Sequence, residues 1–61
     1  MPIIHVELGE GRTYEQKKQL GEAITKATVD IVKVPVEAVK VIFVDMKKEH
    51  LMEGGVLRSE K

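Results

Sequence analysis

Hydrophobic and polar positions repeat along the chain with two different periods, and each period predicts one type of element. From Pro2 to Leu8 the polar residues His5 and Glu7 alternate with apolar ones. Such alternation places the two kinds of side chain on opposite faces and predicts a strand. The turn-forming sequence from Gly9 to Gly11 is expected to end it.

A helical period follows, from Thr13 to roughly Lys33. Thr13 and Gln16 fit a capping box, in which the side chain of each residue accepts a hydrogen bond from the backbone amide of the other. The apolar residues that recur at helical spacing are Leu20, Ala23, Ile24, Ala27, Ile31 and Val34. Pro35 disfavours the helical conformation at Val34 and is therefore expected to stop the helix there.

The segment from Val39 to Met46 predicts a second strand. It is rich in β-branched residues and apolar on both faces except at Lys40 and Asp45, so both of its faces should be covered. The remaining tail, from His50 to Lys61, contains the pair Gly54-Gly55, which indicates a turn. We expect this tail to form a short hairpin or an arm.

Strand, helix and strand make a βαβ unit, so we expect an α/β fold with parallel strands and a right-handed crossover, in one domain over residues 1–61. A chain of 61 residues buries only a small core, and without cysteine it cannot add disulfides. One helix covers one face of a two-stranded sheet and leaves the other face and the edges open. Length and pattern therefore both predict a homo-oligomer.

Charge and composition exclude several classes of partner. Ten basic and ten acidic residues leave no surplus charge for a phosphate backbone, which argues against nucleic-acid binding. The longest uninterrupted apolar run, from Val41 to Val44, is far too short to span a membrane. No pattern typical of a signal peptide is present, so we expect a cytoplasmic protein. His5 and His50 lie too far apart in sequence to match a metal-ligand spacing, so no metal is expected.

Pro2 is the first residue that could take part in catalysis. Inside a chain its nitrogen is an unreactive amide, but removal of Met1 would turn that nitrogen into a secondary amine. An unperturbed α-amino group titrates at about 7.7–8.0, close to the value that suits a proton-transferring base. A proline at this position is common and by itself indicates no activity.

Two cations are the next candidates. Arg12 precedes the helix cap, where its guanidinium could bind a carboxylate with two hydrogen bonds or could simply be solvated. Lys40 interrupts the apolar run that begins at Val39, so its ammonium group either reaches solvent at a sheet edge or faces a pocket. The pattern alone leaves both alternatives open for each residue.

Several motifs together resemble the 4-oxalocrotonate tautomerases, and the resemblance covers essentially the whole chain. The most specific is Glu-Gly-Arg-Thr-x-Glu-Gln-Lys, which begins at Glu10, shortly after the proline. The other matching segments are Met1-Pro2-Ile3-Ile4, Val39-Lys40-Val41-Ile42 and Gly54-Gly55. The resemblance implies a βαβ subunit that assembles as a hexamer, a trimer of dimers. It also implies cofactor-free interconversion of the enol and keto forms of small 2-oxo acids.

The resemblance also implies roles for single residues. Pro2 matches the general base, and Arg12 matches an arginine that binds the distal carboxylate of the substrate. Lys40 stands where the family has a second arginine, which polarises the reacting oxygen, and Leu51 stands where it has a phenylalanine that keeps the site dry. Lysine keeps the charge but loses the planar fork of arginine, so contact with the substrate is expected to be weaker. Because about 20 Å of strand separate Pro2 from the turn before Arg12, we expect the active site to span subunits.

Two alternatives to a tautomerase remain. Glu53 stands where a related dehalogenase branch has a glutamate that activates water, which would make the protein a lyase of the same superfamily. That branch also has paired arginines near the turn, where this chain has Gly9 beside the expected substrate-binding site. The second alternative is a non-catalytic, self-assembling βαβ module in which Met1 is retained and Pro2 is inert.

Overall fold

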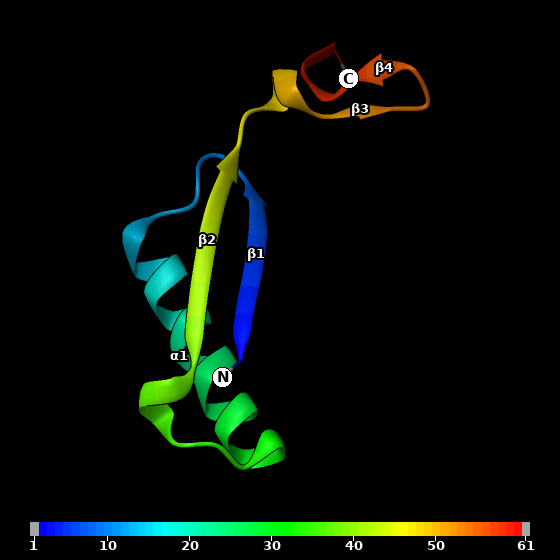
Figure 1. Cartoon of the computed structure of the whole chain (residues 1–61). Coiled ribbons are helices and arrows are strands. Elements are labelled where there is room, and N and C mark those ends of the chain that lie inside the picture. Colours follow the sequence, from blue (N-terminus) through cyan, green and yellow to red (C-terminus); the bar gives the residue numbers. More distant parts are fainter. Residues whose placement is uncertain (1, 61) are drawn as a thin grey trace.

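A computed structural model of the chain describes residues 2–60, which form a strand, a long helix and a second strand, followed by a small hairpin (Figure 1). The elements are β1 (Ile3–Gly9), α1 (Tyr14–Val32), β2 (Lys40–Met46), β3 (Met52–Glu53) and β4 (Val56–Leu57), with short 3₁₀ turns at Val36–Ala38, Lys48–His50 and Arg58–Glu60. The predicted elements are all present, and the bounds of the two long strands differ from expectation by a single residue.

β1 and β2 pair in parallel, with Ile3 opposite Lys40 at one end and Gly9 opposite Met46 at the other. This pairing confirms the predicted α/β fold with a βαβ unit. Exposure alternates along β1, where the even-numbered residues from Ile4 to Leu8 are half-buried and the odd-numbered ones are exposed. The alternation predicted from the sequence therefore separates a face that α1 covers from an open face.

The capping box predicted at the start of α1 is present. The amide of Gln16 donates to the Thr13 hydroxyl at 3.1 Å, and the amide of Thr13 donates to the Gln16 side chain at 3.0 Å. At the other end Lys33 adopts a left-handed conformation, with φ 64° and ψ 52°, and its amide donates to the carbonyl of Val29. The helix therefore ends at Val32, two residues before Val34, the position where Pro35 alone would have ended it.

The C-terminal tail forms the predicted hairpin. Gly54 and Gly55 have φ values of 58° and 83°, and a two-residue hairpin turn of type I′ needs positive φ at both positions. The turn joins β3 and β4 as an antiparallel pair, with Met52 opposite Leu57 and Glu53 opposite Val56. Figure 1 shows this hairpin as an arm beyond the ends of β1 and β2, on the side away from the N-terminus.

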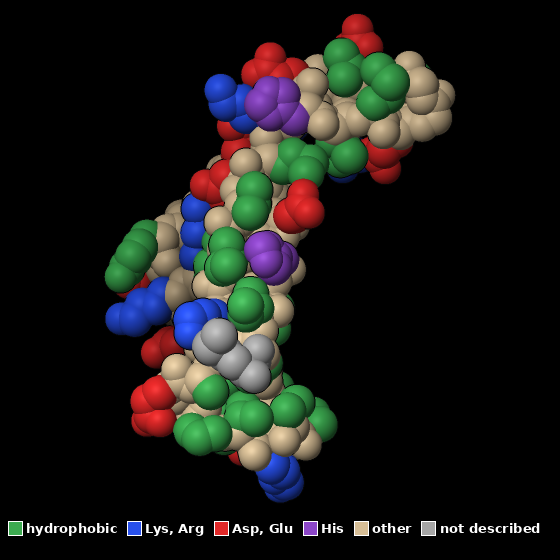
Figure 2. Space-filling view, viewed as in Figure 1, with side chains coloured by type: hydrophobic (Ala, Val, Ile, Leu, Met, Phe, Trp, Pro, Cys, Tyr) green, Lys and Arg blue, Asp and Glu red, His purple; other side chains and the backbone are tan. Residues whose placement is uncertain are grey.

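The chain alone does not enclose a core. No hydrophobic side chain within residues 2–60 is fully buried, although Phe43 packs close to Gly21 of α1. On the opposite, open face of the sheet, Ile3, Ile42 and Val44 are 50%, 42% and 42% exposed. Hydrophobic side chains are visible along this face in Figure 2. The second face of β2, which the sequence predicts to be covered, has no cover from its own chain.

Candidate active site

Two of the predicted site residues meet at the N-terminal end of the sheet. The backbone amide of Lys40 donates to the carbonyl of Pro2 at 3.1 Å, at the end of the sheet where Ile3 lies opposite Lys40. Pro2 is half-buried, whereas Lys40 is exposed and lies on the open face by the alternation of β2. Met1, whose removal would expose the Pro2 nitrogen, lies outside the described residues. The sheet thus places a cationic residue next to the predicted base.

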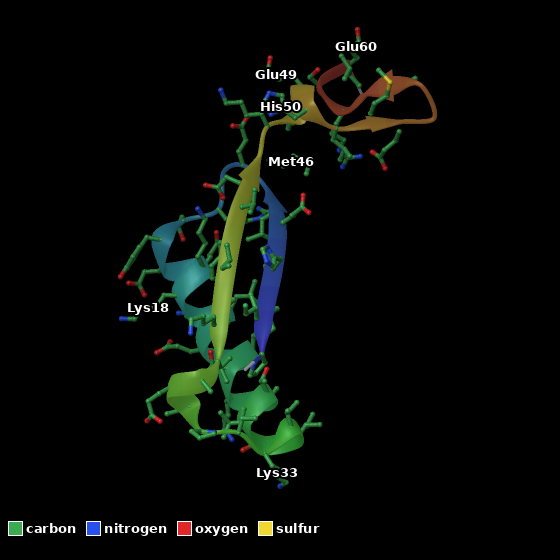
Figure 3. All side chains as sticks on the ribbon, viewed as in Figure 1. Lys18, Lys33, Met46, Glu49, His50 and Glu60 are labelled. Carbon is green, nitrogen blue, oxygen red and sulfur yellow. The ribbon has the colours of Figure 1, made fainter. Side chains whose placement is uncertain are left out.

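The other predicted site residues gather at the opposite end, around a cavity of about 560 Å³. This cavity lies between the C-terminal ends of β1 and β2 and the C-terminal arm. Figure 3 shows Met46, which also lines it, at the junction of β2 and the arm. The predicted residues that line the cavity are Gly9, Arg12, Leu51 and Glu53. We refer to it below as the Arg12 cavity.

The turn that carries Arg12 is held on both sides. The amide of Glu10 donates to the carbonyl of Met46 at 2.9 Å, which ties the turn to the end of β2. An ion pair of 2.7 Å between Lys17 Nζ and Asp45 Oδ2 ties the first turns of α1 to the same strand. No local pattern in the sequence indicates this pair, because its partners are 28 residues apart and meet only once α1 packs on the sheet.

Leu51 is held by the backbone of the arm. Its amide donates to the carbonyl of Lys48 at 3.3 Å, and its carbonyl accepts from the amide of Arg58 at 2.8 Å. The Arg58 side chain reaches the Glu53 carboxylate at 3.5 Å and also lines the Arg12 cavity. Arg58 was not predicted as a site residue, although the register of a Gly54-Gly55 hairpin places it close to Leu51.

The predicted site residues therefore form two groups rather than one. β1 has seven residues, so its length separates Pro2 and Lys40 from the Arg12 cavity by about 20 Å. A single subunit cannot bring the predicted base and Arg12 to the same small molecule. This geometry agrees with the expectation that an active site would draw on more than one subunit.

A second cavity, of about 650 Å³, lies between α1 and β2. Its apolar lining includes Val41 and Phe43, and the charged side chains at its rim belong to α1. None of the predicted site residues lines it. Within residues 2–60 no group of three or more acidic or histidine side chains is arranged to hold a metal ion. The described helices include none that is long and apolar enough to cross a membrane.

Comparison with known proteins identifies the family. The sequence model of a family described as tautomerase enzyme matches residues 2–61, almost the whole chain. This chain belongs to the tautomerase family. A probable tautomerase of Lactococcus lactis is 41% identical to it over 61 residues, which cover the full length of both proteins. The resemblance noted in the sequence is thereby confirmed.

Solved tautomerase structures share the fold. TomN, a 4-oxalocrotonate tautomerase homologue of the tomaymycin biosynthetic pathway, superposes with a TM-score of 0.92 at 41% identity, over 97% of this chain and 91% of TomN. A heterohexameric 4-oxalocrotonate tautomerase of Chloroflexus aurantiacus superposes with a TM-score of 0.90 at 30% identity, over 98% of this chain and 97% of that one. The βαβ unit with its C-terminal hairpin is thus a tautomerase fold.

Proposed function

We propose that this tautomerase interconverts the enol and keto forms of a small 2-hydroxy or 2-oxo dienoic acid, with Pro2 as the general base after removal of Met1. The observation that carries the proposal is the division of the site residues. A basic end with Pro2 and Lys40 and a carboxylate-binding end with Arg12 are complementary halves of one site. Neither half can convert such a substrate alone.

In the proposed reaction the Pro2 amine removes the proton from the 2-hydroxyl oxygen of the enol. The electron pair moves along the conjugated system, and the protonated amine returns the same proton to a carbon further along the chain. No proton is gained or lost overall, so the reaction needs no cofactor. In the proposed site, partial burial or a cation close to the amine would favour its neutral form, which is the form that accepts a proton.

The other proposed site residues bind the charged groups of the substrate or form the wall of the cavity. Lys40 lies next to Pro2 in the sheet and would stabilise the negative charge that develops on the 2-oxygen. Arg12 would bind the distal carboxylate, and Leu51 would form the apolar wall of the cavity beside Gly9. With lysine instead of arginine at position 40, bidentate binding of the substrate is lost. A rise of about 1.4 kcal/mol in the activation barrier lowers the rate tenfold, so this loss can change which substrate is preferred.

We also propose that the functional unit is a homo-oligomer, most simply a hexamer built as a trimer of dimers. Two features of the subunit support it. Apolar side chains remain exposed on the open face of the sheet, and within residues 2–60 β1 and β2 pair only with each other. The similarity to a heterohexameric tautomerase supports an assembly of six subunits. Oligomerisation would cover the open face and bring the two groups of site residues together.

The test is ultraviolet monitoring of 2-hydroxymuconate ketonisation. The protein is first shown by intact mass to have lost Met1. Pro2→Ala is the matched control, because alanine at position 2 also permits removal of Met1 and leaves a primary amine. General bases contribute about 10²–10⁴-fold, so turnover in the variant is expected to fall by that factor. Equal turnover in both proteins, or none in either, would contradict the proposal and favour a non-catalytic module.

A lyase activity that uses Glu53 is the second candidate, because Glu53 lines the same cavity as Arg12. In that case Glu53 would activate water for addition to an acetylenic or haloacrylic acid. Hydration of such an acid by the unmodified protein, lost in Glu53→Gln, would establish this activity. Absence of hydration in the unmodified protein would rule it out.

A further inference from the structure

Arg58 is a second guanidinium at the Arg12 cavity, with no role in the proposed reaction so far. It follows β4 and begins the last 3₁₀ turn, Arg58–Glu60. Its backbone amide donates to the carbonyl of Leu51 at 2.8 Å, so its main chain is fixed beside the expected wall of the site. Arg58 lines the same cavity as Arg12. Two elements far apart in sequence thus present one arginine each to the same space.

Arg58 forms an ion pair with Glu53, and this pair is too weak to compete with a substrate carboxylate for the Arg58 guanidinium. The Arg58 guanidinium and the Glu53 carboxylate are 3.5 Å apart, and their side chains are 54% and 49% exposed. An ion pair this long and this exposed contributes little, because solvent screens it and both side chains lose freedom in forming it. A substrate carboxylate that offers two oxygens to the planar fork can therefore take the place of Glu53.

The charge balance of the cavity depends on Arg58. Four cationic residues line it, namely Arg12, Lys47, Lys48 and Arg58, and three glutamates line it as well. The cavity thus has one more positive than negative side chain, and loss of Arg58 would leave it neutral. Because Glu53 is one of the three glutamates, its neutralisation would have the opposite effect and make the cavity more positive.

We propose that Arg58 is a further substrate-binding residue, which shares with Arg12 the distal carboxylate of the substrate and makes the enzyme select dicarboxylates over monocarboxylates. The proposal rests on the proposed tautomerase function for its kinetic consequences. Its binding consequences can be measured without turnover. Glu53 acts in it as the resting partner that Arg58 leaves when a dicarboxylate enters.

The kinetic test compares two substrates that differ only in the distal carboxylate, 2-hydroxymuconate and 2-hydroxypenta-2,4-dienoate. Arg58→Gln is expected to raise KM for the dicarboxylate about tenfold with little change in kcat, and to leave both constants for the monocarboxylate unchanged. Glu53→Gln is expected to lower KM for the dicarboxylate. Arg58→Lys, which keeps the charge without the fork, should fall between Arg58→Gln and the unmodified protein.

Lys26→Gln is the matched control, since it removes an exposed cation that pairs with Asp30 at 3.3 Å on α1 and that does not line the Arg12 cavity. It should change neither substrate's constants. An equal effect of Arg58→Gln on both substrates would mean that Arg58 only holds the arm in place, and would overturn the proposal. So would the absence of any effect. Size-exclusion chromatography of each variant checks that the assembly is intact.

Binding is measured in parallel by titration calorimetry with muconate, a dicarboxylate, and sorbate, a monocarboxylate with the same six-carbon diene. Weaker binding of muconate but not of sorbate by Arg58→Gln supports the proposal even if the protein turns over neither hydroxy acid, an outcome that would refute only the tautomerase function. Binding of muconate that does not depend on Arg58 refutes the role of Arg58 while leaving the proposed reaction intact.

Discussion

The distance between Pro2 and Arg12 makes a quantitative prediction about mixed assemblies of two inactive variants. Pro2→Ala removes the proposed base, and Arg12→Ala removes the proposed carboxylate-binding group, so each variant alone should have much lower activity at substrate concentrations below KM. The seven residues of β1 keep these positions about 20 Å apart in one chain. Every working site must then take its Pro2 and its Arg12 from different subunits.

The expected recovery follows from random assembly. In an equal mixture half of the subunits carry an intact Pro2, and the other half carry an intact Arg12. A site that pairs the two from different subunits is fully intact with a probability of one half for each residue, so about a quarter of the wild-type activity should return. A site built within one chain would contain one of the two substitutions in every case and would recover nothing.

The assay unfolds the two variants together in guanidinium chloride, refolds them by dialysis and measures ketonisation of 2-hydroxymuconate. Native mass spectrometry confirms that mixed assemblies have formed. Wild-type protein taken through the same cycle sets the scale, and each variant refolded alone sets the background. Mixed assemblies without recovered activity, in a preparation where the wild type regains its own, would refute a site shared between subunits.

Two further substitutions test how the subunit holds the Arg12 turn and the start of α1. Lys17→Gln should destabilise the protein by about 0.5–1 kcal/mol, since the 2.7 Å pair with Asp45 is partly shielded, with the Lys17 side chain 27% exposed. A double-mutant cycle with Asp45→Asn, from urea unfolding at fixed protomer concentration, measures the coupling, and a value near zero would show that the pair is unimportant. Thr13→Ala removes the helix cap and should cost about 1 kcal/mol in the same assay, whereas Thr13→Ser should retain most of the stability. Equal losses in both Thr13 variants would show that the hydroxyl cap contributes nothing.

Most of the fold is predictable from local signals in the sequence. Alternation gives β1 to within one residue, and the capping box places the start of α1 at Tyr14. The pair Gly54-Gly55 gives the hairpin, because both residues must adopt positive φ. The end of α1 is less predictable. Lys33 adopts a left-handed conformation there, which residues with a side chain rarely do. Glycine or asparagine usually occupies such a position and would have indicated the end of the helix, but the sequence has lysine.

The candidate site is harder to predict because its contacts are not local. The Lys17–Asp45 pair forms only when the helix packs on the sheet, and no spacing rule connects residues so far apart. Arg58 enters the Arg12 cavity because β4 returns antiparallel to β3 and the last turn follows it. The resemblance to the family gave Pro2, Arg12 and Leu51 their proposed roles but gave none to Arg58, which reaches the cavity only through the fold of the hairpin.

The division of the site into two ends follows from the topology itself. In a parallel pair the strands start at the same end, so Pro2, which precedes β1, and Lys40, which begins β2, have to be neighbours. Residues that follow the strands, such as Arg12 after β1 and Leu51 after β2, must gather at the other end. No rearrangement of loops within one βαβ unit can unite the two groups, because the strands themselves separate them. Association with a second copy of the chain would therefore solve both problems. It would cover the apolar residues on the open face of the sheet and would complete the divided site. On the proposed assembly, substitutions that weaken association should also abolish catalysis, even at positions far from the substrate.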